Sequence, residues 1–315
     1  MILYHYLLLN CKSKKVGKVY SWSDVETFNI PTPSSTVLAK KIVLDMMEKL
    51  VSEGRVLGGK IYGSYSWGTQ TIRSDLDTLV IYDDFSVLRV LREIRLLTHS
   101  LTKVDFEPVA IHVELAKKGM STVDGSFLGH LKRSPVEGNS FGLDPLDLLK
   151  SKEGKLASFN ADVVRHKIRF MSDAIINPYD KLYSFQRFLE LPMAIARRYI
   201  DTWSTFNQAF SEFKDDSKQP VFETFCKLFP KQTSIGSNMR NIYMLDKNYS
   251  VFLHESLEGR HSREEYDDYL ADIEKKMPSG LYWLKEISDE FGIFLERENR
   301  YGTIEGRPSI NKEVF

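Results

Sequence analysis

The chain has 315 residues, and its 43 Lys and Arg residues balance its 43 Asp and Glu residues. This length is enough for two domains that each bury a core, and the ordinary composition excludes a disordered or collagen-like chain. A formal net charge of zero gives no sign of the strongly basic surface that drives non-specific nucleic-acid binding.

The two cysteines, Cys11 and Cys226, are too few for a disulfide framework or a zinc site. We therefore expect a reducing, cytoplasmic compartment and buried thiols. The opening run "MILYHYLLL" is short and is followed, not preceded, by basic residues, which favours a buried strand over a signal peptide. No stretch approaches the roughly 20 apolar residues of a transmembrane helix, so no membrane partner is expected.

The first part of the chain predicts a compact unit of helices and strands. Residues 1–30 favour one or two short strands with loops. Thr36–Glu53 is predicted as an amphipathic helix, because apolar residues recur at helical spacing. This apolar stripe consists of Leu38, Ile42, Met46 and Leu50. Gly54 is a plausible residue to follow the end of that helix.

Two strands, a helix and a further strand follow. "KIYGS" predicts a short strand that enters a turn, and "DTLVIYDD" predicts a strand rich in β-branched residues. Phe85–Leu101 is predicted as a helix with Leu88, Leu91, Ile94 and Leu97 as its apolar stripe. "KVDFEPVAIHVEL" predicts one long strand, or two strands interrupted near Pro108.

The glycine-rich stretch 117–143 indicates a domain boundary, after which the apolar periodicity is mostly helical. The predicted helices cover residues 144–152, 159–176, 180–202, 205–214, 220–228, 262–276 and 281–297. The expected fold is α+β, with a mixed sheet and flanking helices over residues 1–120 and an all-helical domain over residues 121–315.

Two aspartates, Asp75 and Asp77, stand one residue apart at the start of a predicted strand. Residues at i and i+2 of a strand leave the same face, so the two carboxylates are expected side by side. Such like charges repel unless a cation lies between them. Carboxylate oxygens are preferred Mg²⁺ ligands, and two carboxylates can hold two ions for an in-line displacement at phosphorus.

A Gly-Ser pair, Gly63 and Ser64, precedes this acidic pair. Glycine lets the backbone adopt unusual dihedral angles and approach a ligand closely. The Ser64 hydroxyl and the following amides could bond phosphate oxygens. The turn and the acidic pair together would hold a nucleoside triphosphate and its Mg²⁺.

The stretch "GSYSWGTQTIRSDLD" resembles the signature of the DNA polymerase beta-like nucleotidyltransferase superfamily, over roughly residues 36–115. Gly63 and Ser64 match its Gly-Ser pair, and Asp75 and Asp77 match its first two metal ligands. The pair formed by Gly68 and Thr69 is similar to the Gly-Thr of the minimal members. The sequence departs from the pattern at Thr78, where an apolar residue is usual, and at Trp67, where small members often carry Arg.

The resemblance implies a third carboxylate on a later, neighbouring strand. Asp105 is the best candidate, and the proline three residues later also occurs in some members. Glu107, on the same strand face, and Glu114 are the alternatives. Lys181 and Tyr183 are loosely similar to the basic and hydroxyl residues that helical domains of the superfamily turn toward the triphosphate.

The sequence therefore predicts a two-domain, Mg²⁺-dependent nucleotidyltransferase that binds an NTP with two Mg²⁺ ions. Asp75, Asp77 and Asp105 are its expected catalytic metal ligands, and Gly63, Ser64, Lys181 and Tyr183 are its expected nucleotide-binding residues. An acceptor hydroxyl would attack the α-phosphorus and release pyrophosphate. Arg73 is interpreted as a solvated charge and His112 as a packed residue.

The residues leave the acceptor open. The neutral charge and modest size favour a single-transfer enzyme over a processive polymerase. Candidates are an adenylyltransferase that uses ATP on an aminoglycoside-like small molecule, and an enzyme that nucleotidylates tRNA or protein. The alternative is a catalytically silent, nucleotide-binding interaction or antitoxin-like module, against which both Asp75 and Asp77 count.

Overall fold

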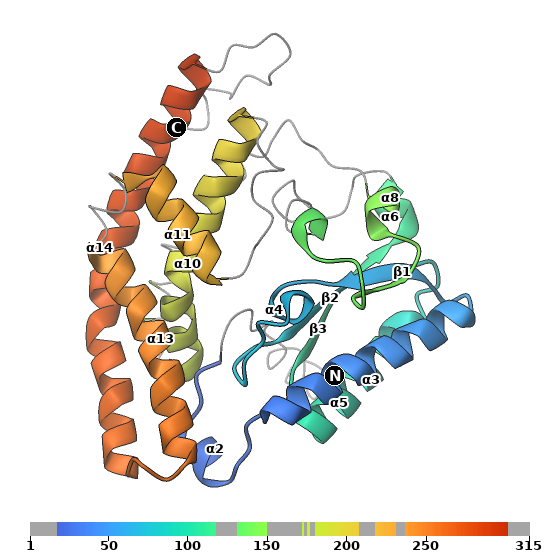
Figure 1. Cartoon of the computed structure of the whole chain (residues 1–315), viewed down its shortest axis with the longest axis horizontal. Helices are drawn as coiled ribbons and strands as arrows, with labels where there is room; N and C mark the ends of the chain where they lie inside the picture. The colour runs from blue at the N-terminus through green and yellow to red at the C-terminus, as the bar shows by residue number, and fades with distance from the viewer. Residues whose placement is uncertain are drawn as a thin grey trace.

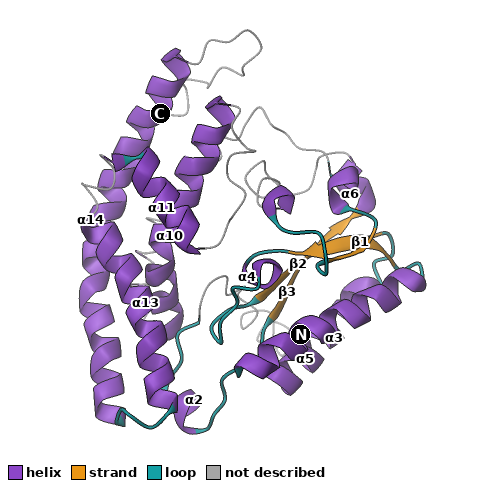
Figure 2. Cartoon of the chain, in the orientation of Figure 1, coloured by secondary structure: helices purple, strands orange, loops and turns teal. Residues whose placement is uncertain are grey.

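A computed structural model describes residues 18–117, 131–149, 172, 175–176, 180–207, 218–230 and 237–301. It shows an α+β protein with a mixed sheet flanked by helices and a helical C-terminal region (Figures 1 and 2), which confirms the predicted class. Among the described residues, no helix is both long enough and apolar enough to cross a membrane. Most of the predicted helix 159–176, part of 205–214, and residues 1–17 with Cys11 lie outside the described residues.

Within the described part of the chain, the sheet has four strands in the order β3-β2-β1-β4. β1 (Val56–Ile61) pairs antiparallel with both β2 (Leu76–Tyr82) and β4 (Ser140–Gly142). β2 pairs parallel with β3 (Phe106–His112), which is a single strand through Pro108. Proline is tolerated there because β3 is an edge strand, where a missing backbone N–H breaks no ladder bond on the open side.

Two helices, α3 (Pro33–Ser52) and α5 (Val87–Thr102), cover one face of the sheet (Figure 1). Both helices were predicted, but their buried stripes differ from the expected ones. α3 buries Ala39, Val43, Met47 and Leu50, and leaves Leu38 exposed. α5 buries Val87, Leu91, Ile94 and Thr98, and leaves Leu88 and Leu97 exposed.

The opposite face of the sheet packs against two short helices, α6 (Val113–Lys117) and α8 (Pro145–Leu148). α8 and β4 both follow residue 120, where the predicted first domain ends. The sheet layer therefore uses chain from beyond that predicted boundary, because β4 closes the open edge of β1.

The helical region is built from α10 (Lys181–Asn207), α11 (Lys218–Leu228), α13 (Ser237–Leu257) and α14 (Arg263–Tyr301). Two predicted helices, 262–276 and 281–297, are one continuous helix that runs through Pro278. α10 likewise continues through Pro192. Neighbouring helices in the bundle supply packing that outweighs the local cost of a proline.

The predicted strands at the start of the chain are wrong over the described residues. Residues 22–26 form a helix, α2, whose start is fixed by a capping box between Ser21 and Asp24. Val19, Tyr20, Val25 and Ile30 are buried in the core of the helical bundle, not in the sheet. This segment therefore belongs to the helical bundle by packing, although the sheet follows it in the chain (Figure 1).

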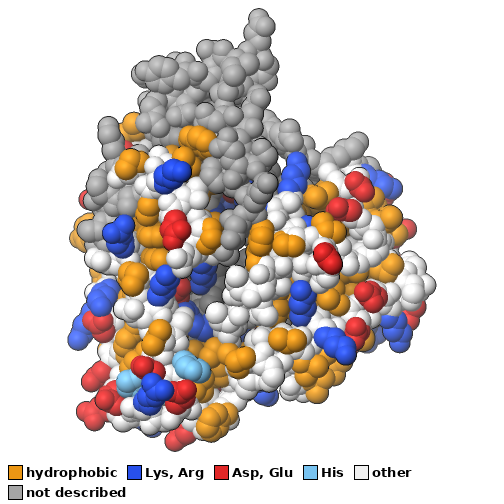
Figure 3. Space-filling model, in the orientation of Figure 1, with side chains coloured by type: hydrophobic (Ala, Val, Ile, Leu, Met, Phe, Trp, Pro, Cys, Tyr) orange, Lys and Arg blue, Asp and Glu red, His pale blue; other side chains and the backbone are white. Residues whose placement is uncertain are grey.

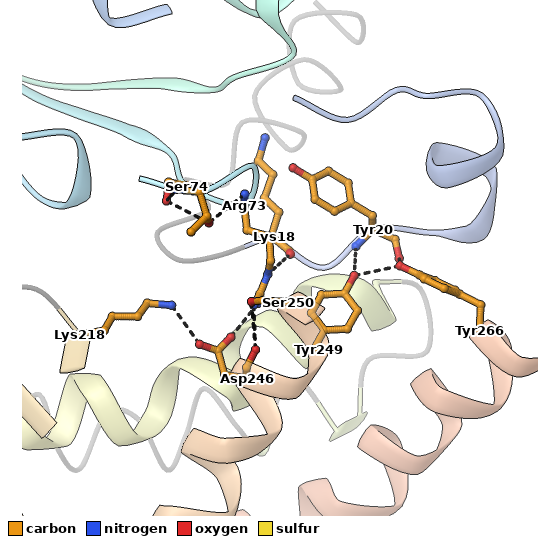
Figure 4. Close-up of polar contacts among 10 residues, drawn as sticks. Lys18, Tyr20, Arg73, Ser74, Lys218, Asp246, Tyr249, Ser250 and Tyr266 are labelled. Atoms are coloured by element: carbon orange, nitrogen blue, oxygen red, sulfur yellow. Dashed lines mark hydrogen bonds and ion pairs between the residues drawn. The ribbon is translucent and has the colours of Figure 1, made fainter. Parts of the chain in front are cut away.

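A cluster of polar side chains joins the loop before β2 to α13 (Figure 4). Its centre is Arg73, whose side chain is only 2% exposed. Arg73 Nη2 pairs with Asp246 Oδ1 at 2.7 Å, and Arg73 Nη1 donates to Ser250 Oγ at 2.6 Å. The guanidinium also lies 4.7 Å from the ring centroid of Tyr249, a cation–π contact. We call Arg73, Asp246, Tyr249 and Ser250 the Arg73 cluster.

The interpretation of Arg73 as a solvated charge is therefore wrong. A guanidinium can be buried when several acceptors satisfy its fixed donors, as the carboxylate, the hydroxyl and two backbone carbonyls do here. One of those carbonyls belongs to Lys18, so the cluster also ties down the chain that precedes α2.

We expect Arg73→Ala to lower the free energy of unfolding by about 3–5 kcal/mol, because it leaves the Asp246 carboxylate buried with less compensating charge. Arg89→Ala, an exposed arginine on α5, is the matched control and should stay within about 0.5 kcal/mol of wild type. Urea denaturation of both variants measures the difference, and equal midpoints would refute the structural role of Arg73.

The Asp246 carboxyl should make stability depend on pH. Burial alone would raise its pKa, but Arg73 and Lys218 lower the pKa to about 2. Because an aspartate in the unfolded chain titrates near a pKa of about 3.9, this contribution is complete above that value and is lost as the pH falls through the folded pKa. Between about pH 5 and pH 2, unfolding free energy should fall by roughly 2 kcal/mol more in wild type than in Asp246→Asn. Parallel pH profiles by urea denaturation would contradict this assignment.

Candidate functional site

The parallel register of β2 and β3 gathers four carboxylates at one end of the sheet. Asp77 pairs with Glu107 across the two strands. Asp75 and Asp105 each stand one residue before their strand, and Leu76 N donates to Asp105 O at 2.9 Å. Paired residues of parallel strands face the same side, so Asp77 and Glu107 share the sheet face opposite α3 and α5.

The Asp75 carboxylate is the most buried member of the expected metal set, with a side chain only 2% exposed. Burial raises its pKa well above the ordinary value, the charges of Glu107, Asp77 and Asp105 raise it further, and Lys18 opposes the rise. These effects place the other three carboxylates within electrostatic range of Asp75. Such a cluster binds a cation favourably, because the cation removes both the burial cost and the repulsion.

Asp105 already has two cationic or polar partners. The Lys18 ammonium forms an ion pair with Asp105 Oδ2, and His99 Nδ1 lies 2.8 Å from Asp105 Oδ1. Burial alone would raise the Asp105 pKa, but the hydrogen bond from His99 and the charge of Lys18 hold the pKa well below its usual value. The Lys18 Nζ atom also lies 3.9 Å from Asp75 Oδ1, so one ammonium bridges two strands.

The two alternatives to Asp105 differ in position. Glu107 is buried beside Asp77 and lies 3.8 Å from Arg95 Nη2 of α5. Glu114 lies in α6, beyond the far end of β3, and pairs with Lys117 at 3.5 Å. The sheet thus brings Asp105 and Glu107 to the acidic pair and does not bring Glu114 there.

The Gly-Ser turn lies directly against this carboxylate cluster. Gly63 has a φ of 70°, which an L side chain rarely adopts, and a Cβ atom built on it would lie 2.9 Å from Asp77 Oδ2. Tyr62 N, one residue earlier, donates to Asp77 O at 3.1 Å. Ser64 then begins the short helix α4 (Ser64–Trp67). Only glycine allows the backbone this close to the Asp77 carboxylate.

The structure places the two residues that depart from the expected pattern. Thr78 is fully buried in β2, and its hydroxyl has no hydrogen-bond partner among the described residues. Trp67 is half-buried at the end of α4. Its Nε1 atom and the hydroxyl of Tyr65 are buried polar atoms with no hydrogen-bond partner among the described residues. Burial, Asp75 and Asp77 all raise the Tyr65 pKa, so this phenol lies near the acidic pair.

The two bundle residues predicted to face the triphosphate, Lys181 and Tyr183, make contacts with other residues of the helical bundle. Lys181 Nζ pairs with Glu274 of α14 at 3.1 Å, and the Tyr183 ring lies 4.8 Å from the Arg187 guanidinium, so these contacts lie within the bundle. Arg197 of α10 is a bundle cation within electrostatic range of Asp77. Burial and the neighbouring Arg133 lower the Arg197 pKa, while acidic groups that include Asp77 oppose this shift.

The molecular surface is hollowed between the bundle and the sheet layer (Figure 3). Lys and Arg side chains gather on the bundle side of this hollow in the face shown.

Sequence reasoning missed Lys18, His99 and Arg197 as members of this region. The spacing of His99 on α5, six residues before Asp105, is a local signal that could have indicated the His99 contact. Lys18 and Arg197 carry no such signal, because they approach from segments far from Asp75 in the sequence.

The four carboxylates fit a hard divalent cation in chemistry, and a positively charged group already lies between two of them. As placed, no group of three or more His, Cys, Asp or Glu side chains within the described ranges is arranged to hold a metal ion. The fit therefore rests on the oxygen donor set, the close approach of Gly63 to Asp77, and the ammonium between Asp75 and Asp105.

Comparison with known proteins adds no family to this description. No protein-family model matches the chain, and a search of curated proteins finds no match either.

We expect Gly63→Ala to lower the unfolding free energy by at least about 1 kcal/mol more than Gly68→Ala. Both glycines have positive φ, near 70° and 67°, but their ψ values differ. Gly68, with a ψ of 18°, lies in the left-handed helical region, whereas Gly63, with a ψ of −153°, lies in a region essentially reserved for glycine, so Gly63→Ala incurs the larger backbone strain. Only the Cβ at position 63 would collide with Asp77, since nothing lies within 4 Å of a Cβ at position 68. Urea denaturation compares the two variants. Equal losses would mean that the turn is not packed against Asp77 as described.

Proposed function

We propose that this protein is a Mg²⁺-dependent nucleotidyltransferase of the DNA polymerase beta-like type. The single observation that carries the proposal is the contact between the Gly63 turn and Asp77, at the end of β2 where Asp75, Asp105 and Glu107 also lie. A phosphate-binding turn beside a carboxylate cluster is what a nucleoside triphosphate with its cation requires.

The residues have distinct roles in this proposal. Asp75, Asp77 and Asp105 hold Mg²⁺, and Gly63 with Ser64 contacts the triphosphate. Bound Mg²⁺ would neutralise the phosphate charges and assist the departure of pyrophosphate. The Asp105 carboxylate, with its low pKa, is ionised at neutral pH and can accept a hydrogen bond from the acceptor hydroxyl.

Two arginines supply positive charge for the phosphates in this proposal. Arg197 lies near Arg133 and within electrostatic range of Asp77, and the Arg133 side chain is only 8% exposed. Asp201 partly compensates them, with Arg133 Nη2 lying 3.3 Å from Asp201 Oδ1. We assign these arginines, in place of Lys181 and Tyr183, to the triphosphate.

The acceptor in this proposal is a single hydroxyl on a small molecule, a tRNA or a protein. The ion pair between Lys18 and Asp105 favours one other function, a silent nucleotide-binding module whose metal position is filled by the lysine. Nucleotide binding distinguishes the two, because an enzyme of the proposed type needs Mg²⁺ and Asp75 to bind an NTP tightly and a silent module does not.

We expect Asp75→Asn and Asp77→Asn each to lower the rate of nucleotidyl transfer by at least about 100-fold, because each removes a charged metal ligand. The assay incubates the protein with each α-labelled NTP and Mg²⁺, offering cell extract, tRNA and aminoglycosides as acceptors. Asp105→Asn should lower the transfer rate by a similar factor, and Glu107→Gln should lower it by less than about 10-fold. This difference tests the choice of Asp105 as the third ligand.

Asp83→Asn is the matched control for these variants. Asp83 is an exposed aspartate just after β2, at the far end of the strand from the cluster, and its loss should leave the rate unchanged. Thermal unfolding shows that each variant is folded. The proposed function would be overturned if the Asp75 and Asp77 variants labelled every acceptor as well as wild type does.

A further inference from the structure

The Lys18 side chain occupies the middle of the carboxylate site, although the sequence gives it no role. Its ammonium forms an ion pair with Asp105 and lies 3.9 Å from Asp75, and the side chain is only 12% exposed. We propose that Lys18 is a built-in cation of this site, which competes with the divalent ion for Asp75 and Asp105 and must withdraw before that ion is bound. This inference rests on the proposed function, because it requires these carboxylates to bind a divalent ion.

The backbone of Lys18 is fixed by Arg73, two residues before Asp75. Lys18 N donates to Arg73 O at 2.9 Å, and Arg73 Nε donates to Lys18 O at 2.9 Å. This reciprocal pair places the lysine beside the entry to β2. The Lys18 ammonium therefore reaches Asp75 and Asp105 from a backbone whose position is fixed by hydrogen bonds.

The next residues of the chain are held equally well. Tyr20 N donates to Tyr249 Oη at 2.9 Å, and Tyr266 Oη donates to Tyr20 O at 3.1 Å (Figure 4). Tyr20 Oη in turn donates to Ile72 O at 2.9 Å. These bonds attach the chain that carries Lys18 to α13 and α14 on one side and to the loop before β2 on the other.

Charge makes the lysine and a divalent ion mutually exclusive. A metal ligated by Asp75 and Asp105 would lie within a few ångströms of the present ammonium, and two cations at such a distance repel strongly in a partly buried site. The lysine stem has several rotatable bonds, so its ammonium can leave while the backbone stays bound to Arg73.

Lys18 therefore compensates part of the negative charge of the site when no divalent ion is present. Its charge opposes the rise in the Asp75 pKa, which is caused chiefly by burial and also by the neighbouring carboxylates, and it lowers the Asp105 pKa. The cost of displacing it lowers the apparent affinity for the divalent ion. A movement of α13 or α14 that displaces Tyr20 would alter the free energy needed to displace the Lys18 ammonium, because Tyr20 lies two residues from Lys18.

The experiment is a titration of the full chain with Mn²⁺ alone, a divalent probe whose free form gives an electron paramagnetic resonance signal. Lys18→Met should bind Mn²⁺ at least about tenfold more tightly than wild type. Lys18→Arg, which keeps the charge, should bind no more tightly than wild type. Lys40→Met is the matched control, since Lys40 lies beside the same turn but contacts the Tyr65 carbonyl at 3.3 Å and no carboxylate.

Thermal unfolding gives a second readout on the same variants. Without Mn²⁺, Lys18→Met should unfold at a lower temperature than wild type, because its carboxylates lose their counter-charge, and Mn²⁺ should raise its midpoint more than that of wild type. A folded Lys18→Met that binds Mn²⁺ with wild-type affinity, or more weakly, overturns the inference.

A further variant separates failure of this inference from failure of the proposed function. Asp75→Asn combined with Asp77→Asn should abolish Mn²⁺ binding in the wild-type and in the Lys18→Met background. If it does so while Lys18→Met and wild type bind equally, the metal site stands and the role of Lys18 is refuted. If neither wild type nor Lys18→Met binds Mn²⁺, the inference and the proposed metal site both fail.

Discussion

Repulsion among four carboxylates is the constraint around which this end of the molecule is arranged. The parallel pairing of β2 and β3 fixes Asp77 opposite Glu107 and brings Asp75 beside Asp105, although the four negative charges repel one another. The surrounding positions supply compensation in the form of an ammonium from Lys18 and an imidazole from His99. A site built at such electrostatic cost is more readily explained by a bound cation than by stability, because apolar residues at these strand positions would pack without it.

Much of the sheet layer could be predicted from sequence, because its signals are local. Short runs of apolar and β-branched residues located β2 and β3, and the Gly-Ser turn with its following acidic pair located the candidate site. The buried stripes of α3 and α5 could not be fixed in the same way. Both helices contain adjacent apolar residues, such as Ile42 with Val43 and Leu96 with Leu97, so two helical faces are nearly equally apolar. Packing against the sheet then selects between them, and sequence periodicity does not report that choice.

Two further errors share a different cause, which is long-range contact. α14 continues through Pro278 because bundle packing outweighs a local signal that normally ends a helix. The burial of Arg73 depends on Asp246, which lies far along the chain, and the sequence around Arg73 gives no signal of that partner. The start of α2 is the exception, since the capping box of Ser21 and Asp24 is visible in the sequence and was overlooked.

These long-range contacts explain how the helical bundle can influence the chemistry of the sheet. Arg73 is bound on one side to Asp246 and Ser250 of α13, and on the other to the backbone of Lys18. Asp75 follows it by two residues, so the same buried guanidinium fixes both the acidic pair and the cation that neutralises it. A displacement of α13 would move the two together relative to β3, where Asp105 stays in register with β2 through the Leu76 amide. In the proposed competition between Lys18 and a divalent ion, the contacts that hold Arg73 would therefore contribute to the balance together with the carboxylates.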